Sequence, residues 1–376
     1  MTARGRRSER GVTLVELMVT LLVSSLAVGF TFRIYGQSSL TYRSQMRVSE
    51  LQQTLRTAKD MLVRDLRQAG ALAANVHLGV SGVDLIYPAV TVDNDADRTG
   101  PDKLRLLGAD LSCLAGVTGP GTSTASGSTS SAAWNSGETR VSSSVCFAVN
   151  DTAALVRRAD PGKGTSCVMK ITGKTTGRFD RLEHAAGVVP WNLSANAQCL
   201  SVSTSSPYDG NTVAVKFAAR TYRIKPNDRR GVLQVSPSAE FVAGDWQDLA
   251  LGFVDLQVAL RVYDPNGLID HDSDGDPKRN WYSSENMESP TLLTADRQLL
   301  QARISLVART VSDIEGVASA LTPELIAGGR PLAHNGIGDR PAIVVPVADP
   351  TSRYHGNHLY RYTSSLVEFR NLGIGL

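Results

Sequence analysis

The sequence predicts an α+β fold, in which one long N-terminal α-helix packs on a mainly antiparallel β head. Three observations predict it: an apolar run over residues 12–32, an amphipathic helical repeat over residues 33–72, and short alternating strands through residues 73–376. No period of 20 to 50 residues recurs, which excludes solenoids and propellers. The chain of 376 residues is therefore expected to bury a real core in its C-terminal part.

The apolar run is long enough to cross a membrane. Residues 12–32 contain one charged side chain, Glu16, and a helix of this length spans roughly 31 Å against about 30 Å of hydrocarbon. Arginines at positions 4, 6, 7 and 10 precede the run, so residues 1–11 are expected in the cytoplasm and the rest of the chain outside it. A plain signal anchor and a signal peptide cut after Ala27 are the alternatives. Glu16 argues against both, because a carboxylate inside such a helix costs about 2.5–3.5 kcal/mol.

The amphipathic repeat continues the same helix. Apolar side chains recur at three- and four-residue steps, and no proline precedes Pro88, so a helix without a kink is expected. Gly70 and later glycines end the pattern. The predicted buried stripe consists of Val48, Leu51, Leu55, Ala58, Leu62, Leu66 and Ala69.

The head reads as a series of short strands bounded by turn residues. A hairpin is expected around residues 226–230, and residues 115–144, rich in Gly, Ser and Thr, are expected to form a flexible insertion. The predicted strands are residues 103–108, 144–149, 167–172, 212–225, 231–237, 252–263, 302–311 and 359–369.

Charge and motifs argue against two classes of function. The formal charge is +3, from 39 basic and 36 acidic residues, and the first eleven residues carry all of this excess. A neutral body argues against non-specific nucleic-acid binding, since such binding depends on clustered Lys and Arg, and no specific nucleic-acid partner is expected. Neither a GxSxG elbow nor an HExxH zinc motif occurs, so no catalytic residue is predicted and the protein is not expected to be an enzyme.

The four cysteines predict disulfides. Cys113, Cys146, Cys167 and Cys199 form no CxxC pair, which disfavours a zinc site. Export to an oxidising compartment makes two disulfides the expectation, and the spacing favours Cys113 with Cys146 and Cys167 with Cys199, although four cysteines allow three pairings.

One acidic loop could bind a cation. Asp270, Asp272, Asp274 and Asp276 surround Gly275, as in the first half of an EF-hand loop, so Ca²⁺ is a possible ligand although no cofactor is required. Position 12 of such a loop would be Trp281, where a bidentate Glu is needed. A solvated acidic turn is the alternative.

The segment Arg10-Gly11-Val12-Thr13-Leu14-Val15-Glu16-Leu17 resembles the type IV prepilin leader, which pilins share with type II secretion pseudopilins. The resemblance implies that prepilin peptidase cuts after Gly11, that the new Val12 terminus is N-methylated, and that the apolar helix is retained. Glu16 is then an assembly determinant, because its carboxylate can pair with the Val12 amine of the neighbouring subunit.

The head resembles PilW-type minor pilins at residues 252–258, 302–309 and 360–371. That resemblance implies a pilin-like lollipop in a priming complex at the pilus tip. Its partners would be other minor pilins, the major pilin, a PilY-type adhesin and the inner-membrane pilus platform. The protein would sit in the inner membrane before assembly and at the cell surface afterwards. The alternatives are a J-type pseudopilin, a tip adhesin and a DNA-uptake pilin.

Overall fold

The computed structural model describes residues 13–69, 75–80, 83–93, 100–117, 138–157, 165–176, 180–185, 192, 212–240, 242, 244–269, 275–282, 297–310, 358 and 360–369. The chain divides into two compact units, Met1–Glu50 and Leu51–Leu376. The boundary falls inside the long helix α1, so the first unit is described by α1 residues alone and the second unit holds the rest of α1 with every strand.

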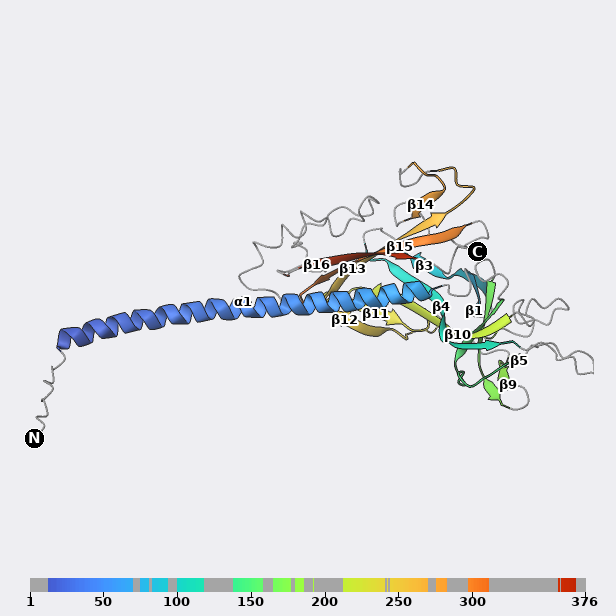
Figure 1. The fold of residues 1–376 in the computed structure, drawn as a ribbon, viewed down its shortest axis with the longest axis horizontal. Coiled ribbons are helices and arrows are strands. Elements are labelled where there is room, and N and C mark those ends of the chain that lie inside the picture. The colour runs from blue at the N-terminus through green and yellow to red at the C-terminus, as the bar shows by residue number, and fades with distance from the viewer. Residues whose placement is uncertain are drawn as a thin grey trace, which may run out of the picture. The chain divides into compact units, whose positions relative to one another are not determined.

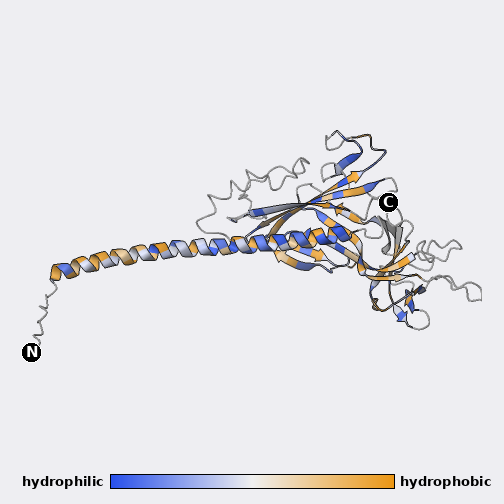
Figure 2. Ribbon diagram, viewed as in Figure 1, coloured by the Kyte–Doolittle hydropathy of each residue, from blue (hydrophilic) through white to orange (hydrophobic). Residues whose placement is uncertain are grey.

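Helix α1 spans Leu14–Gln68 without interruption, in agreement with the absence of proline (Figure 1). It ends four residues before the predicted limit at 72, because the backbone of Ala69 instead pairs with that of Gly108 in a β-bridge. Figure 2 shows that apolar residues dominate the beginning of α1 and that polar residues become frequent towards its end. Six of the seven stripe residues are buried, and Val48, in the first unit, is half-buried.

The strands form three sheets. The largest sheet has nine strands, ordered β12-β11-β10-β6-β7-β1-β2, with β4 on β10 and β3 on β4; the second is ordered β14-β13-β15-β16 and the third β5-β9-β8. All pairs are antiparallel except β1 with β7. The strands are β1 Asn75–Val80, β2 Val83–Pro88, β3 Val90–Asp93, β4 Lys103–Gly116, β5 Glu138–Val141, β6 Thr152–Arg157, β7 Thr165–Lys170, β8 Gly173–Thr175, β9 Asp180–Glu183, β10 Thr212–Ile224, β11 Val232–Ser236, β12 Gln247–Leu251, β13 Phe253–Tyr263, β14 Arg279–Tyr282, β15 Gln298–Arg309 and β16 Tyr360–Glu368.

One apolar core joins α1 to the two larger sheets. It contains Leu51, Leu55, Leu62 and Leu66 of α1 together with side chains of β3, β4, β10 and β11 on one side and of β13, β15 and β16 on the other. Burial of this stripe stabilises the last part of α1, since helices within proteins gain most of their stability from such packing. The α+β prediction, a long helix packed on an antiparallel sheet, is confirmed.

The two larger sheets meet at a glycine. The Gly252 amide donates to the Gly231 carbonyl at 2.6 Å, which brings the starts of β11 and β13 together. Gly231 has a φ of +68°, and a Cβ there would collide with the carbonyl oxygen of Phe253. The position therefore needs glycine both for its left-handed backbone and for this close approach.

Two sequence predictions in the head need correction. Residues 144–149, predicted as a strand, form turns, because the Asp151 carboxylate accepts the Ala148 amide and a disulfide holds Cys146. The predicted insertion 115–144 is ordered at both ends: β4 runs on to Gly116, and β5 occupies Glu138–Val141. The predicted hairpin at 226–230 is confirmed by the antiparallel pairing of β10 with β11.

Candidate assembly site

Helix α1 begins at a side-chain cap. The Thr13 hydroxyl oxygen accepts the Glu16 amide at 3.2 Å, and the Thr13 carbonyl accepts the Leu17 amide at 3.1 Å. Thr13 is thus the N-cap and Glu16 the third helical residue, the spacing of a capping box. This geometry places the Glu16 carboxylate in the first turn, where the partial positive charge of the helix favours it.

The first part of α1 has the surface of a membrane span. Every large apolar side chain from Leu14 to Phe32 is more than half exposed, and by length and composition the helix can cross a membrane. The hydroxyls of Thr20, Ser24, Ser25 and Thr31 donate to α1 carbonyls three or four residues earlier, at 2.7–2.9 Å. Those hydroxyl donors need no water, as a lipid environment requires.

Glu16 is the exception in this segment. It is the one charged residue between Leu14 and Phe32, and no described residue bonds to its carboxylate. Because a lone carboxylate in hydrocarbon costs about 2.5–3.5 kcal/mol, its retention calls for a cationic partner outside the described residues. The predicted partner group, the amine of Val12, and the predicted cleavage residue Gly11 both lie outside the described residues.

Residues 6–32 match the family model for the prokaryotic N-terminal methylation motif. The methylation motif covers the arginines at positions 6, 7 and 10, the Gly11–Val12 bond, Glu16 and the apolar segment. It supports a type IV pilin-like or pseudopilin protein, with processing by prepilin peptidase, assembly with other pilins and anchoring in the inner membrane. The methylation motif favours a structural role over an enzymatic one. No curated protein and no solved structure gives a significant match to the chain.

Exposed apolar side chains continue beyond the predicted membrane segment. Tyr35, Tyr42 and Met46 are 73%, 63% and 56% exposed, and their spacing of seven and four residues places them on one face of α1. The methylation motif ends before them, at residue 32. A helix face of this kind outside lipid is suited to contact with another helix.

In the second unit, a buried polar cluster that the sequence did not reveal attaches α1 to the head. Asp65 is 5% exposed, and its Oδ2 accepts hydrogen bonds from the Arg220 guanidinium and the Tyr222 hydroxyl, both on β10. Burial, followed by the bond to Asp65, raises the pKa of Tyr222. Burial opposes the charge on Arg220, but the bond to Asp65 and its charge outweigh burial and raise the Arg220 pKa. The signal that could have revealed this cluster is Asp65 itself, an acidic residue three positions after Leu62 on the buried face of α1.

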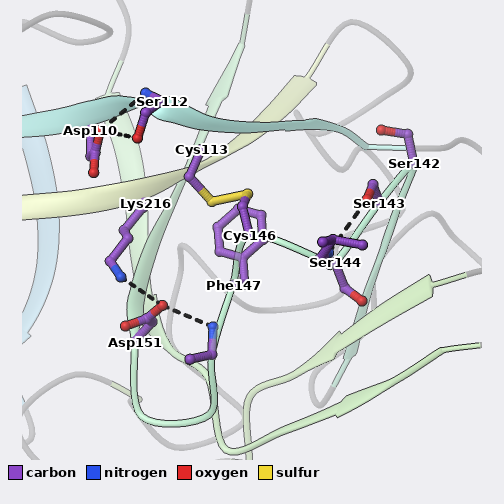
Figure 3. Close-up of a disulfide and its surroundings, with 12 residues drawn as sticks. Asp110, Ser112, Cys113, Ser142, Ser143, Ser144, Cys146, Phe147, Asp151 and Lys216 are labelled. Carbon is purple, nitrogen blue, oxygen red and sulfur yellow. Dashed lines mark hydrogen bonds and ion pairs between the residues drawn. A yellow bond between two sulfur atoms is a disulfide. The ribbon is translucent and has the colours of Figure 1, made fainter.

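A disulfide joins the end of β4 to the turn that precedes β6 (Figure 3). It links Cys113 and Cys146, the pairing that the spacing favoured, with 5.5 Å between the Cα atoms. Beside it, Lys216 on β10 pairs with Asp151 at 2.9 Å. Cys167 on β7 also forms a disulfide, and its predicted partner Cys199 lies outside the described residues.

The predicted cation loop is described only at its end. Asp270, Asp272 and Asp274 lie outside the described residues. Asp276 lies inside them and accepts the Lys278 amide at 3.0 Å, as in a turn. Asp264, which could have added a ligand, is paired with Arg297 at 2.8 Å. Among the residues that the structure describes, no group of three potential ligands forms a metal site.

Proposed function

We propose that this protein is a minor pilin of a type IV pilus. The observation that carries the proposal is the prepilin-type methylation motif at residues 6–32, followed by an apolar helix that keeps Glu16 in its first turn. Prepilin peptidase would cut after Gly11, and N-methylation would follow at Val12. The mature chain would then begin one residue before the Thr13 cap.

Glu16 is the assembly determinant in this proposal. Cleavage creates an amine at Val12, and the apolar surface of α1 keeps water away from both charged groups. The Glu16 carboxylate of one subunit therefore pairs with the Val12 amine of the next, because no described residue bonds to the Glu16 carboxylate and an unpaired charge in lipid is costly. This pairing fixes the axial offset between neighbouring helices, and the exposed face at Tyr35, Tyr42 and Met46 extends the contact beyond the membrane.

The size of the head favours a minor pilin at the pilus tip. The second unit runs from Leu51 to Leu376, whereas J-type pseudopilins generally have a smaller head. The segments that resemble PilW-type proteins lie in β13, β15 and β16, which form adjacent strands of one sheet. The proposed partners are other minor pilins, the major pilin, the inner-membrane platform and a PilY-type adhesin, and the proposed final location is the pilus tip.

A J-type pseudopilin of type II secretion is the second candidate, since the same leader serves both systems. Deleting the gene distinguishes the two. Loss of pili with normal secretion supports the pilus, and loss of secretion with normal pili supports the pseudopilin.

Substitution of Glu16 tests the assembly step. Glu16→Ala is expected to be processed at Val12 yet to be missing from sheared pilus fractions, as measured by mass spectrometry and immunoblotting. Ser25→Ala is the matched control, because the Ser25 hydroxyl bonds only within α1. Normal amounts of the Glu16→Ala protein in the pilus fraction would contradict the proposed pairing.

A further inference from the structure

The two glycines of α1 flank one arginine. Gly29 and Gly36 lie four residues before and three residues after Arg33, so all three share one face of the helix, within the first unit. Apart from the helix backbone itself, a Cβ at either glycine would meet no described atom within 4 Å. Each glycine costs about 1 kcal/mol relative to alanine inside a helix. The pair leaves open space on both sides of the Arg33 side chain.

The charge of Arg33 is not compensated within α1. Arg33 is exposed, and its side chain forms no ion pair or hydrogen bond with any residue that the structure describes. No position within one helical turn of it is acidic, and the sequence between Glu16 and Glu50 contains no acid at all. An anionic partner for this guanidinium therefore has to come from outside the helix.

Arg33 lies where the apolar segment meets the lipid headgroups. It directly follows Phe32 and is the first charged residue after Glu16. The helix between Glu16 and Arg33 spans about 26 Å, against about 30 Å of hydrocarbon. With the Glu16 carboxylate at one boundary, Arg33 comes within about 4 Å of the other, a distance that a long basic side chain can bridge. Its guanidinium therefore reaches the phosphates of the leaflet at the C-terminal end of the span.

We propose that Arg33, Gly29 and Gly36 form a binding site for the headgroup of an anionic phospholipid such as phosphatidylglycerol. The guanidinium binds the lipid phosphate through paired N–H bonds, and the two glycines let the headgroup approach the helix beside Arg33. Phosphatidylcholine is disfavoured, because its own choline already compensates the phosphate. The inference rests on the membrane-spanning role of α1 and is independent of the minor-pilin assignment.

A second helix is the other occupant that two glycines could admit, because small residues allow helix backbones to approach closely. The Arg33 side chain projects between the two glycines and would hold a helix backbone away from them. Its charge would also need an acid from that helix at the membrane boundary. Charge complementarity and location therefore favour the lipid.

The test uses the full chain in liposomes that contain equal amounts of phosphatidylglycerol and phosphatidylcholine. Phe30, three residues before Arg33 on the same face, is replaced by the photoreactive p-benzoylphenylalanine, and mass spectrometry counts the adducts of each lipid. Phosphatidylglycerol adducts should outnumber phosphatidylcholine adducts about fivefold, the ratio expected for one basic residue near the membrane surface. The readout is local, so the arginines of residues 1–11 do not contribute to it.

Two pairs of variants separate the site from a general effect of charge. Arg33→Gln should bring the adduct ratio close to one. Arg43→Gln is its control, because Arg43 is also exposed and unpaired among the described residues but lies about 15 Å further along α1. Gly36→Leu keeps the charge and fills the space beside it, so it should lower the ratio at least twofold. Ala27→Leu adds the same side chain on a different face of α1 and should leave the ratio unchanged.

The lipid site is refuted if the chain with Arg33 intact gives a ratio of one, or if Arg33→Gln keeps the original ratio. Equal losses in Arg33→Gln and Arg43→Gln would also refute it, because they would show a diffuse attraction without a site. Adducts with a second copy of the chain in place of lipid would overturn the choice of occupant. All of these substitutions lie in the first unit, so the head should remain folded in every variant.

Discussion

Gly108 of β4 lies against the last turn of α1, and replacing it tests how the helix is attached. A Cβ built at Gly108 would lie 2.6 Å from the Gln68 carbonyl oxygen, 3.2 Å from its carbonyl carbon and 3.3 Å from the Ala69 Cα. All three atoms are backbone, so no side-chain rotation can relieve the collision. Gly108→Ala must therefore push the last turn of α1 away from the sheet.

The expected cost follows from this geometry. Real Cβ contacts essentially never fall below 3.0 Å, so the helix end must move by at least about 0.4 Å. The movement also loosens Leu66, which is fully buried, and the β-bridge of Ala69. Overpacking of this kind costs about 1–3 kcal/mol. We expect Gly108→Ala to lower the free energy of unfolding of the head by that amount.

Urea unfolding of the disulfide-intact chain, followed by tryptophan fluorescence, measures the effect. Gly116→Ala is the matched control, since it lies on the same strand and its Cβ would meet only the Ser142 hydroxyl, at 3.7 Å. Both substitutions reduce the conformational freedom of the unfolded chain equally. The difference between their free energies of unfolding therefore measures the cost of the collision at Gly108. If the two variants agree within about 0.5 kcal/mol, the ordinary scatter of neutral substitutions, the close attachment of α1 at Gly108 is refuted.

Three further predictions follow from buried or acidic groups. Burial lowers the pKa of His184 from 6.5 to about 4, so the stability that its neutral form contributes is complete above pH 6.5 and is lost as the pH falls towards 4. The free energy of unfolding of the wild type should be about 2 kcal/mol lower at pH 5 than above pH 6.5, and His184→Gln should not show this loss. Equal slopes of unfolding free energy against pH in the two proteins would contradict the prediction. Asp65→Asn should lower the free energy of unfolding, measured in urea, by about 1–3 kcal/mol, because it removes the carboxylate charge to which Arg220 and Tyr222 both bond. The exposed control Asp60→Asn should change it little. Equal effects of the two substitutions would refute the structural role of the buried cluster. If the acidic loop at 270–276 binds Ca²⁺, millimolar Ca²⁺ should raise the thermal midpoint of the wild type but not of Asp270→Asn, and an unchanged wild-type midpoint would dismiss the site.

The helix was predictable from the sequence because its signals are local. Apolar composition, a 3.6-residue repeat and the absence of proline determine α1, and the stripe from Leu51 to Ala69 is buried as predicted. Strands β10, β11, β13, β15 and β16 were also recognised, because each alternates over many residues or is bounded by clear turns. The spacing favoured the Cys113–Cys146 pairing among the three that four cysteines allow, and the structure contains it.

The remaining features depend on contacts between distant parts of the chain. Residues 144–149 alternate like a strand, yet the disulfide and the Asp151 carboxylate turn them. Short strands such as β5, β8 and β9 carry too few residues for a pattern to stand out. The sequence analysis did not single out Asp65, and only the register of β10 brings Arg220 and Tyr222 to its carboxylate. Gly108 likewise gave no local sign that a helix end would lie against it.

The mass of the mature chain tests the central claim most directly, namely that the leader is removed and the apolar helix is kept. Intact-mass and N-terminal analysis of the protein purified from its native membrane should give a chain that begins at Val12, one methyl group heavier than the unmodified sequence. A chain that begins at Met1, or at Val28 after loss of the apolar helix, would contradict the account.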